Sequence, residues 1–176
     1  DLPDDNEVIF IGKGIGFNKK SGSVITEKQA EKVFVLKDEK DKKEYLDLMK
    51  YVSVELVSLM SDIMTIIYDE FDNDINDRIH ITLTDHLSFT LKRLKLGYTV
   101  NGFFLEESKF LFEREYKTAE KVTKLIEDKL NITLPPEEVS FITMHIYSAR
   151  EKITVTSAKR QAETIVDIIN YIEFEM

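Results

Sequence analysis

Residues 46–66, LDLMKYVSVELVSLMSDIMTI, decide the fold class of this chain, because apolar side chains recur in them every three or four positions. That spacing is the period of an α-helix with one buried face. The positions that form the apolar face are Leu46, Met49, Val52, Leu56, Leu59, Ile63 and Ile66. The stretch predicts one long amphipathic helix in a mainly α-helical protein.

The same helical period continues through most of the chain that follows. Apolar residues from Ile79 to Leu94 repeat it and end near Gly97, and two prolines at 135–136 suit the first turn of a later helix. The helices predicted after the first are 79–94, 103–116, 119–130 and 137–150. They predict an all-α bundle of about five helices over residues 38–152.

A last helical pattern begins at Ala158 and ends, at Ile172, with an apolar stripe that no later residue covers. Residues 153–176 therefore read as a linker and the beginning of a further unit. From this we expect the chain to be a piece of a longer protein.

The first 37 residues show a different sequence pattern, without the helical period. Short apolar runs at 7–11 and 32–36 are separated by a segment that holds four of the six glycines. Such runs, broken by glycine and polar turns, are typical of short strands. We expect a small antiparallel β module of three strands, which is truncated or pairs with a copy of itself because so few strands rarely stand alone.

Composition excludes several classes of protein. The 176 residues include no cysteine, which removes disulfides, thiolate metal sites and a thiol nucleophile. No long uncharged apolar run and no signal peptide are present, so a cytoplasmic location is the simple interpretation. The net charge of −9 argues against nucleic acid, yet residues 1–37 hold six lysines and six acids, and 8–25 hold three lysines and no acid. A polyanion could still dock on that local surface.

Candidate chemistry is confined to the three histidines. No phosphate-binding loop and no serine elbow is present, and the glycines at 12–16 precede no helical pattern. On helical geometry His86 and His145 lie at the edge of apolar faces, whereas His80 lies between the apolar and outer faces. A structural role is the common one for such histidines, and no His-x3-His spacing supports a metal site. We expect no metal and no cofactor.

Three strings nevertheless resemble a known family. IGKGIGFNKKSG at 11–22, followed by EKVF at 31–34, is similar to the co-antiterminator RNA-binding domain of the BglG family of bacterial transcriptional antiterminators. INDRIHITLTDHLSFTLKR at 75–93 and LPPEEVSFITMHIYSAR at 134–150 resemble the two histidine segments of its phosphotransferase-system regulation domain, or PRD. The resemblance implies a partial RNA-binding domain at 1–37, a first PRD at 38–152 and the start of a second at 153–176.

What the resemblance implies about function is specific. Proteins of this family bind, as homodimers, a hairpin in the leader RNA of a sugar-utilisation operon and so prevent transcription termination. Phosphotransferase-system proteins, the sugar permease EII and HPr, phosphorylate their PRDs on histidine. The chain would be a regulator and not an enzyme.

The family's functional positions can be carried over residue by residue. Gly12, Lys13 and Phe17 match the RNA-contacting face. Glycine lets backbone approach the RNA, Phe17 can stack on an unpaired base, and Lys19 and Lys20 would neutralise phosphates.

In the helical part, His86 and His145 match the phosphorylatable pair, with Asp85 and Arg93 as supporting polar residues. The resemblance assigns no role to His80. The resemblance also implies an additional first strand with RNA-contacting asparagines, which these residues do not include, and we expect weak or no RNA binding without it.

Two other classes stay open at this point. A PRD also occurs in DNA-binding transcriptional activators, although the glycine-rich string argues against one because such readers use helix-turn-helix units. A metal-dependent phosphohydrolase could use the histidines and Asp85, and stoichiometric bound metal would favour it.

Overall fold

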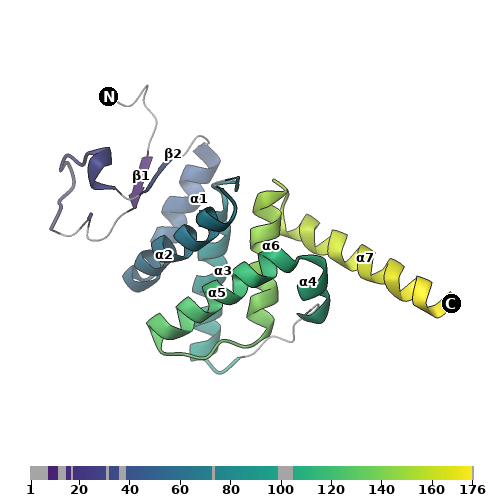
Figure 1. The fold of residues 1–176 in the computed structure, drawn as a ribbon. Helices are drawn as coiled ribbons and strands as arrows, with labels where there is room; N and C mark the ends of the chain where they lie inside the picture. Colours follow the sequence, from purple (N-terminus) through teal and green to yellow (C-terminus); the bar gives the residue numbers. More distant parts are fainter. Residues whose placement is uncertain are drawn as a thin grey trace.

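A computed structural model describes residues 8–11, 15–16, 18–30, 32–35, 39–72, 74–98 and 105–175 of the chain. Two strands and a 3-10 turn come first, followed by helices (Figure 1). The elements are β1 (Val8–Ile11), η1 (Glu27–Gln29), β2 (Lys32–Val35), α1 (Glu39–Met49), α2 (Val54–Glu70), α3 (Ile79–Lys95), α4 (Leu105–Leu111), α5 (Glu113–Leu130), α6 (Glu137–Arg150) and α7 (Val155–Glu175). Within these residues no helix combines the length and the apolar character needed to span a bilayer.

The two strands form one antiparallel pair. Val8 lies opposite Val35, and Ile11 lies opposite Lys32. In Figure 1 this pair lies at the N-terminal end of the molecule, beside α1. A third strand is not among the described residues, so the complete three-stranded module stays a prediction.

The single long helix predicted over 46–66 is wrong, because the chain breaks between α1 and α2. Ser53 has extended backbone angles, and its hydroxyl accepts a hydrogen bond from the backbone N–H of Leu56 at 3.2 Å. A serine at this N-cap position satisfies a backbone donor that a new helix leaves unpaired, so a second helix starts there. The break also changes the helical phase: Leu48 is buried, whereas Leu46, predicted on the apolar face, is 52% exposed.

A second predicted boundary also moves. The break expected between residues 116 and 119 lies at Phe112 instead, between α4 and α5. Thr118 is fully buried and continues α5, since its hydroxyl donates to the Arg114 carbonyl at 2.9 Å. Phe112 turns into a small apolar cluster with Met144 and Ala162, and its ring centroid lies 4.3 Å from that of Tyr147.

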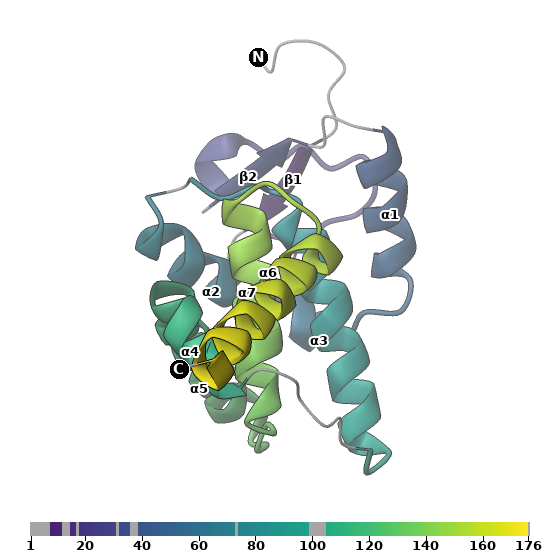
Figure 2. The ribbon, with the colours of Figure 1, turned by 90° about the vertical axis from the view of Figure 1, so that its right-hand side faces the viewer.

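The main core lies between α2, α3, α5 and α6. Its largest side chains with less than 2% exposure include Ile63, Ile67, Leu83, Leu87, Val122, Ile142 and Ile146. Burial of one such side chain contributes about 1.5–3 kcal/mol relative to leaving it in water. Helix α6 packs against α3, α4, α5 and α7, so it is the element around which the bundle is organised (Figure 2).

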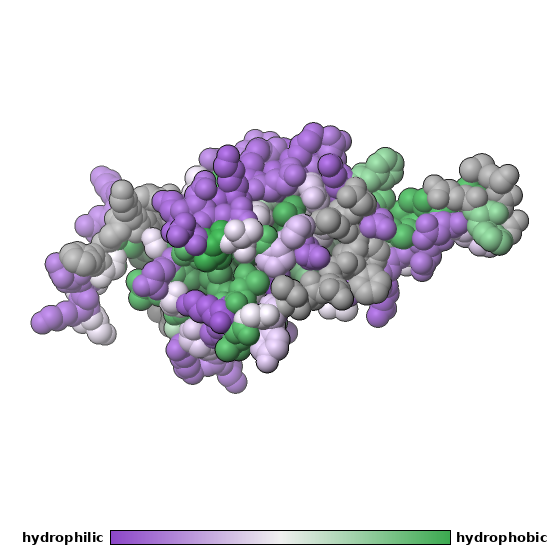
Figure 3. Space-filling view, turned by 90° about the horizontal axis from the view of Figure 1, so that it is seen from below, coloured by the Kyte–Doolittle hydropathy of each residue, from purple (hydrophilic) through white to green (hydrophobic). Residues whose placement is uncertain are grey.

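Helix α7 joins the bundle through its first half only. Ala158 and Ala162 are buried there, where α7 crosses α6, and the helix then projects away (Figures 1 and 2). Its distal half carries exposed aliphatic and aromatic side chains, and hydrophobic residues appear green along the projecting arm in Figure 3. The exposed side chains are Ile165, Ile168, Tyr171, Ile172 and Phe174.

Candidate functional site

The fold brings together two histidines that lie far apart in the sequence. His86 is in the middle of α3 and His145 is in α6, and their ring centroids lie 4.9 Å apart with 37° between the ring planes. The phenyl ring of Phe141 lies 5.7 Å from the His86 ring and borders the pair. The His86 side chain retains 16% exposure, whereas His145 is buried. The structure thus places one accessible and one enclosed imidazole side by side.

A buried carboxylate, Glu138, connects three side chains of α3 to α6. One carboxylate oxygen lies 3.0 Å from His86 Nε2 and accepts a hydrogen bond from the Thr90 hydroxyl at 3.1 Å. The other oxygen pairs with the guanidinium of Arg93. His86, Thr90 and Arg93 follow one another at i, i+4 and i+7, which places them on the same face of a helix. With the carboxylate 1% exposed, these contacts replace the water it has lost.

The Glu138 carboxyl is held in its ionised form. Burial alone pushes its pKa upward, but the hydrogen bond and charge of His86, the charge of Arg93 and the hydrogen bond from Thr90 outweigh burial. Its pKa therefore lies below the usual value for glutamate. An ionised carboxylate only accepts hydrogen bonds, so His86 donates from Nε2.

The His145 imidazole is neutral at physiological pH. Burial is the largest cause, and the neighbouring charge of His86 adds to it, so that its pKa falls to about 3. Among the residues the structure describes, its buried Nδ1 has no hydrogen-bond partner. A neutral ring can lie against His86 without the repulsion that two imidazolium ions would produce.

Asp85 and Arg93, both predicted to support the histidines, have different surroundings. Arg93 belongs to the Glu138 cluster, whereas Asp85 is exposed and accepts a hydrogen bond from the Tyr51 hydroxyl at 2.9 Å. That hydrogen bond is the main reason why the pKa of Tyr51 is raised. The ammonium of Lys92 lies 4.5 Å from the centroid of the Tyr51 ring. Asp85 thus ties α3 to the segment between α1 and α2.

His80 lies away from this pair. It was predicted between the apolar and outer faces of its helix, but it is 7% exposed and belongs to the interior, because α2 covers that side of α3. Its ring lies 6.1 Å from that of Tyr68, whose hydroxyl donates to Asp77 at 2.9 Å. These contacts give His80 a packing role.

The predicted RNA-contacting residues are only partly described. Gly12, Lys13 and Phe17 lie outside the described residues. Lys19 and Lys20 are exposed in a turn where the backbone N–H of Lys20 donates to the Ser23 hydroxyl at 3.1 Å. Both ammonium groups are therefore accessible to a polyanion.

Sequence reasoning missed Thr90 and Glu138. The polar residues at 86, 90 and 93 stand one and two turns apart on the same face of their helix, and this spacing could have indicated a shared partner. Glu138 carries no such signal, because an acid in the first turn of a helix is common on electrostatic grounds alone.

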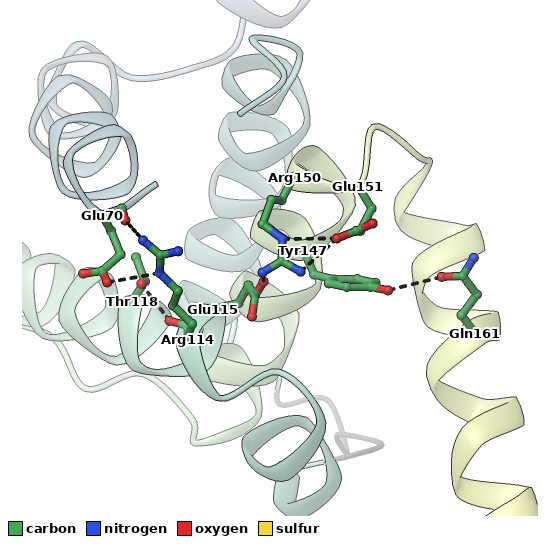
Figure 4. A network of polar contacts seen from close by, with 8 residues as sticks. All are labelled: Glu70, Arg114, Glu115, Thr118, Tyr147, Arg150, Glu151 and Gln161. Atoms are coloured by element: carbon green, nitrogen blue, oxygen red, sulfur yellow. Dashed lines mark hydrogen bonds and ion pairs between the residues drawn. The ribbon is translucent and has the colours of Figure 1, made fainter. Parts of the chain in front are cut away.

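A second polar network attaches α7 to the bundle (Figure 4). Glu115, 3% exposed, pairs with the Arg150 guanidinium, which also donates to Glu151 at 2.8 Å. The Tyr147 hydroxyl in turn donates to Gln161 of α7 at 3.4 Å. On its other side, α5 contacts α2 through Arg114, which bonds the carbonyl and the carboxylate of Glu70. This network has a structural role at the start of the projecting helix.

Comparison with known proteins matches two domain families. Residues 2–43 match the CAT RNA binding domain, and residues 61–149 match the PRD domain. Among solved structures, one described as the crystal structure of GlcT CAT-PRDI has a TM-score of 0.74 and 42% sequence identity. The match covers 81% of this chain and 84% of that one.

Several curated proteins are similar over most of the chain. Protein GlcT of Staphylococcus saprophyticus is 36% identical over 165 residues, which are 93% of this chain and 57% of that protein. The PtsGHI operon antiterminator of Bacillus subtilis is 37% identical over 168 residues, covering 96% and 60%. Transcription antiterminator LicT of the same organism is 29% identical over 169 residues, covering 94% and 61%. The chain spans about three fifths of the length of these relatives.

Proposed function

Because the chain belongs to the BglG family, with a CAT RNA binding domain ahead of a PRD domain, we propose that it is a transcriptional antiterminator controlled by histidine phosphorylation. It would bind a leader-RNA hairpin of a sugar-utilisation operon and prevent termination. The observation that carries the proposal is the pair of adjacent imidazoles, one of them accessible, between α3 and α6. Relatives named as antiterminators support the RNA-directed output.

His86 is the acceptor of the first phosphoryl group in this proposal. Its side chain is partly exposed, whereas His145 is buried and would need α6 to move before a donor protein could reach it. The donors are phosphotransferase-system proteins, the sugar permease EII or HPr. Arg93 lies on the other oxygen of the carboxylate that binds His86, and it supplies a positive charge near the new group.

Phosphorylation would act by charge. A phosphoryl group adds about −1.5 to −2 charges at neutral pH. It would lie near the ionised Glu138, in a chain whose net charge is already −9. The contact between α3 and α6 is the element that this repulsion biases, and through Tyr51 and Asp85 a movement of α3 would reach the segment after α1. We expect this movement to change the dimer that presents the RNA-binding module.

Phosphate incorporation tests the proposal that the chain is regulated by phosphorylation of His86. The purified chain is incubated with phosphorylated HPr or with the phosphorylated sugar permease EII domain, and phosphohistidine is mapped by mass spectrometry. His86→Ala is expected to abolish incorporation by at least one donor, and His80→Gln is the matched control that keeps it. Equal incorporation in wild type and His86→Ala with both donors would refute His86 as the acceptor.

A salt titration tests the proposal that the chain binds a leader-RNA hairpin. Binding of a leader hairpin is measured against salt concentration for wild type and for Lys19→Ala/Lys20→Ala. If both lysines neutralise phosphates, the slope of log affinity against log salt becomes shallower by about 1.4–1.8. Lys124→Ala, which removes an exposed lysine of α5, is expected to leave the slope unchanged. An unchanged slope in the double variant would exclude this turn from the RNA contact.

A further inference from the structure

The contact between Glu138 and His86 determines which nitrogen of the imidazole carries the proton. In a neutral histidine one ring nitrogen bears hydrogen and the other bears a lone pair. The Glu138 oxygen lies 3.0 Å from Nε2 and, as a carboxylate, only accepts. Nε2 therefore bears the hydrogen, and in the neutral form of the ring, which is the form that can attack a phosphoryl group, the lone pair resides on Nδ1.

The surroundings keep the carboxylate in this orientation. Thr90 donates to the oxygen that also binds His86, and Arg93 occupies the other oxygen. Because Glu138 is 1% exposed, water has little access to replace these partners, and rotation away from Nε2 would break all three contacts. All three partners come from α3, so one helix fixes the orientation of the carboxylate that α6 supplies.

We propose that Glu138 is a positioning residue that makes Nδ1 of His86, and not Nε2, the atom that accepts the phosphoryl group. The proposal rests on the proposed function, since it names the reacting atom of that site. A donor cannot bond to Nε2 without displacing its proton and breaking a charge-assisted hydrogen bond. The Nδ1 lone pair takes no part in that hydrogen bond, so attack from Nδ1 leaves the contact at Nε2 in place. The same arrangement orients a histidine wherever a carboxylate holds its other ring nitrogen.

The transfer balances without another reactant. The Nδ1 lone pair attacks the phosphorus of a phosphohistidine on the donor protein, and the new N–P bond forms as the donor's N–P bond breaks. The electron pair of the broken bond returns to the donor imidazole. His86 keeps its Nε2 proton, so its ring gains positive character during transfer, and the Glu138 carboxylate stabilises that charge.

The tautomer can be measured before any phosphoryl transfer. Long-range ¹H–¹⁵N correlation spectra of the ¹⁵N-labelled chain distinguish a protonated from an unprotonated ring nitrogen. His86→Gln assigns the signals of His86. Wild type is expected to show His86 almost entirely as the Nε2–H tautomer. An Nδ1–H tautomer at His86 would overturn the proposal.

Two glutamates of the same helical turn provide the variant and its control. Glu138→Gln keeps the size of the side chain but replaces the carboxylate by a neutral acceptor, and Glu137→Gln makes the same change one position earlier. Charge-assisted hydrogen bonds are roughly twice as strong as neutral ones, so the tautomer ratio in Glu138→Gln should fall by about tenfold, or about 1.4 kcal/mol. Glu137→Gln should keep the wild-type ratio. A ratio unchanged in Glu138→Gln would contradict the positioning role.

The phosphorylated product gives the second readout. After incubation with phosphorylated HPr, and in a parallel sample with the phosphorylated EII domain, ¹H–¹⁵N and ³¹P spectra identify the phosphohistidine isomer. Wild type and Glu137→Gln should carry the phosphoryl group on Nδ1, and Glu138→Gln should give a mixture of isomers. Phosphoryl on Nε2 of wild-type His86 would overturn this proposal and leave the proposed function intact.

The two proposals fail in distinguishable ways. If neither donor modifies His86, the proposed function fails and the acceptor atom fails with it, while the tautomer spectrum still reports whether Glu138 binds Nε2–H. If Glu138→Gln does not fold, as circular dichroism would reveal, the wild-type tautomer and isomer alone decide the question.

Discussion

Acidification should destabilise the helical bundle through His145 at a higher pH than the one at which Glu138 takes up a proton. His145 is 8% exposed, and burial, with a smaller contribution from the charge of His86, lowers its pKa to about 3. An unfolded histidine has a pKa of about 6.5. The unfolded chain therefore binds a proton at this position more readily than the folded chain does, and stability falls as the pH drops below about 6.5.

The size of the effect follows from these two values. Between pH 7 and pH 5 the folded His145 stays neutral, whereas the unfolded one becomes almost fully protonated. Linkage at about 1.4 kcal/mol per pH unit then removes about 2 kcal/mol of the free energy of unfolding. Glu138, whose pKa is lowered, acts in a different window: its contribution is lost only as the pH falls below about 4.5.

Urea denaturation at pH 7, 6 and 5 measures this loss. His145→Leu removes the titrating group at similar volume, and the buried Nδ1 that it deletes has no hydrogen-bond partner among the described residues. The free energy of unfolding of wild type should fall by about 2 kcal/mol more than that of His145→Leu over this range. Parallel decreases in the two proteins would refute the reasoning, because they would show that His145 takes up its proton equally well in both states.

Three further perturbations test other contacts of the site and its surroundings. Arg93→Ala leaves the Glu138 carboxylate buried without its cation. In urea denaturation the free energy of unfolding should therefore fall by about 3 kcal/mol. Adding Glu138→Gln should restore part of this loss. Ser53→Ala removes the N-cap of α2 and should lower the free energy of unfolding by about 1 kcal/mol, measured from the shift of the same urea transition. A loss below the error of the fit would show that the cap is dispensable. Tyr51→Phe deletes the exposed hydrogen bond to Asp85 and should change stability by less than about 0.5 kcal/mol, so a larger thermal shift would assign that contact more than a surface role.

Much of the helical architecture could be predicted from periodicity. The range 137–150 agrees with α6, and the apolar face from Leu56 to Ile63 lies in the core. The two boundaries that were wrong have different causes, one local and one tertiary. At Ser53 a side-chain hydrogen bond starts a new helix inside a continuous apolar pattern, and at Phe112 packing against α6 and α7 breaks the chain where no glycine or proline indicates it.

The candidate site divides in the same way. The resemblance named His86, His145 and Arg93. The fold brings the two histidines into contact, and Arg93 pairs with the same Glu138 carboxylate that contacts His86. The resemblance did not indicate Glu138 itself. Asp85, named beside them, turns instead toward Tyr51.

The sequence by itself determined the fold class, the helical periods and the family, because these depend on local spacing and on contiguous strings of residues. Only the tertiary structure decided the pairing of His86 with His145, their difference in burial and the orientation of the His86 ring. The physical reason is that a pKa and a tautomer depend on distances to groups on another helix. Those distances exist only once α3 and α6 have packed together.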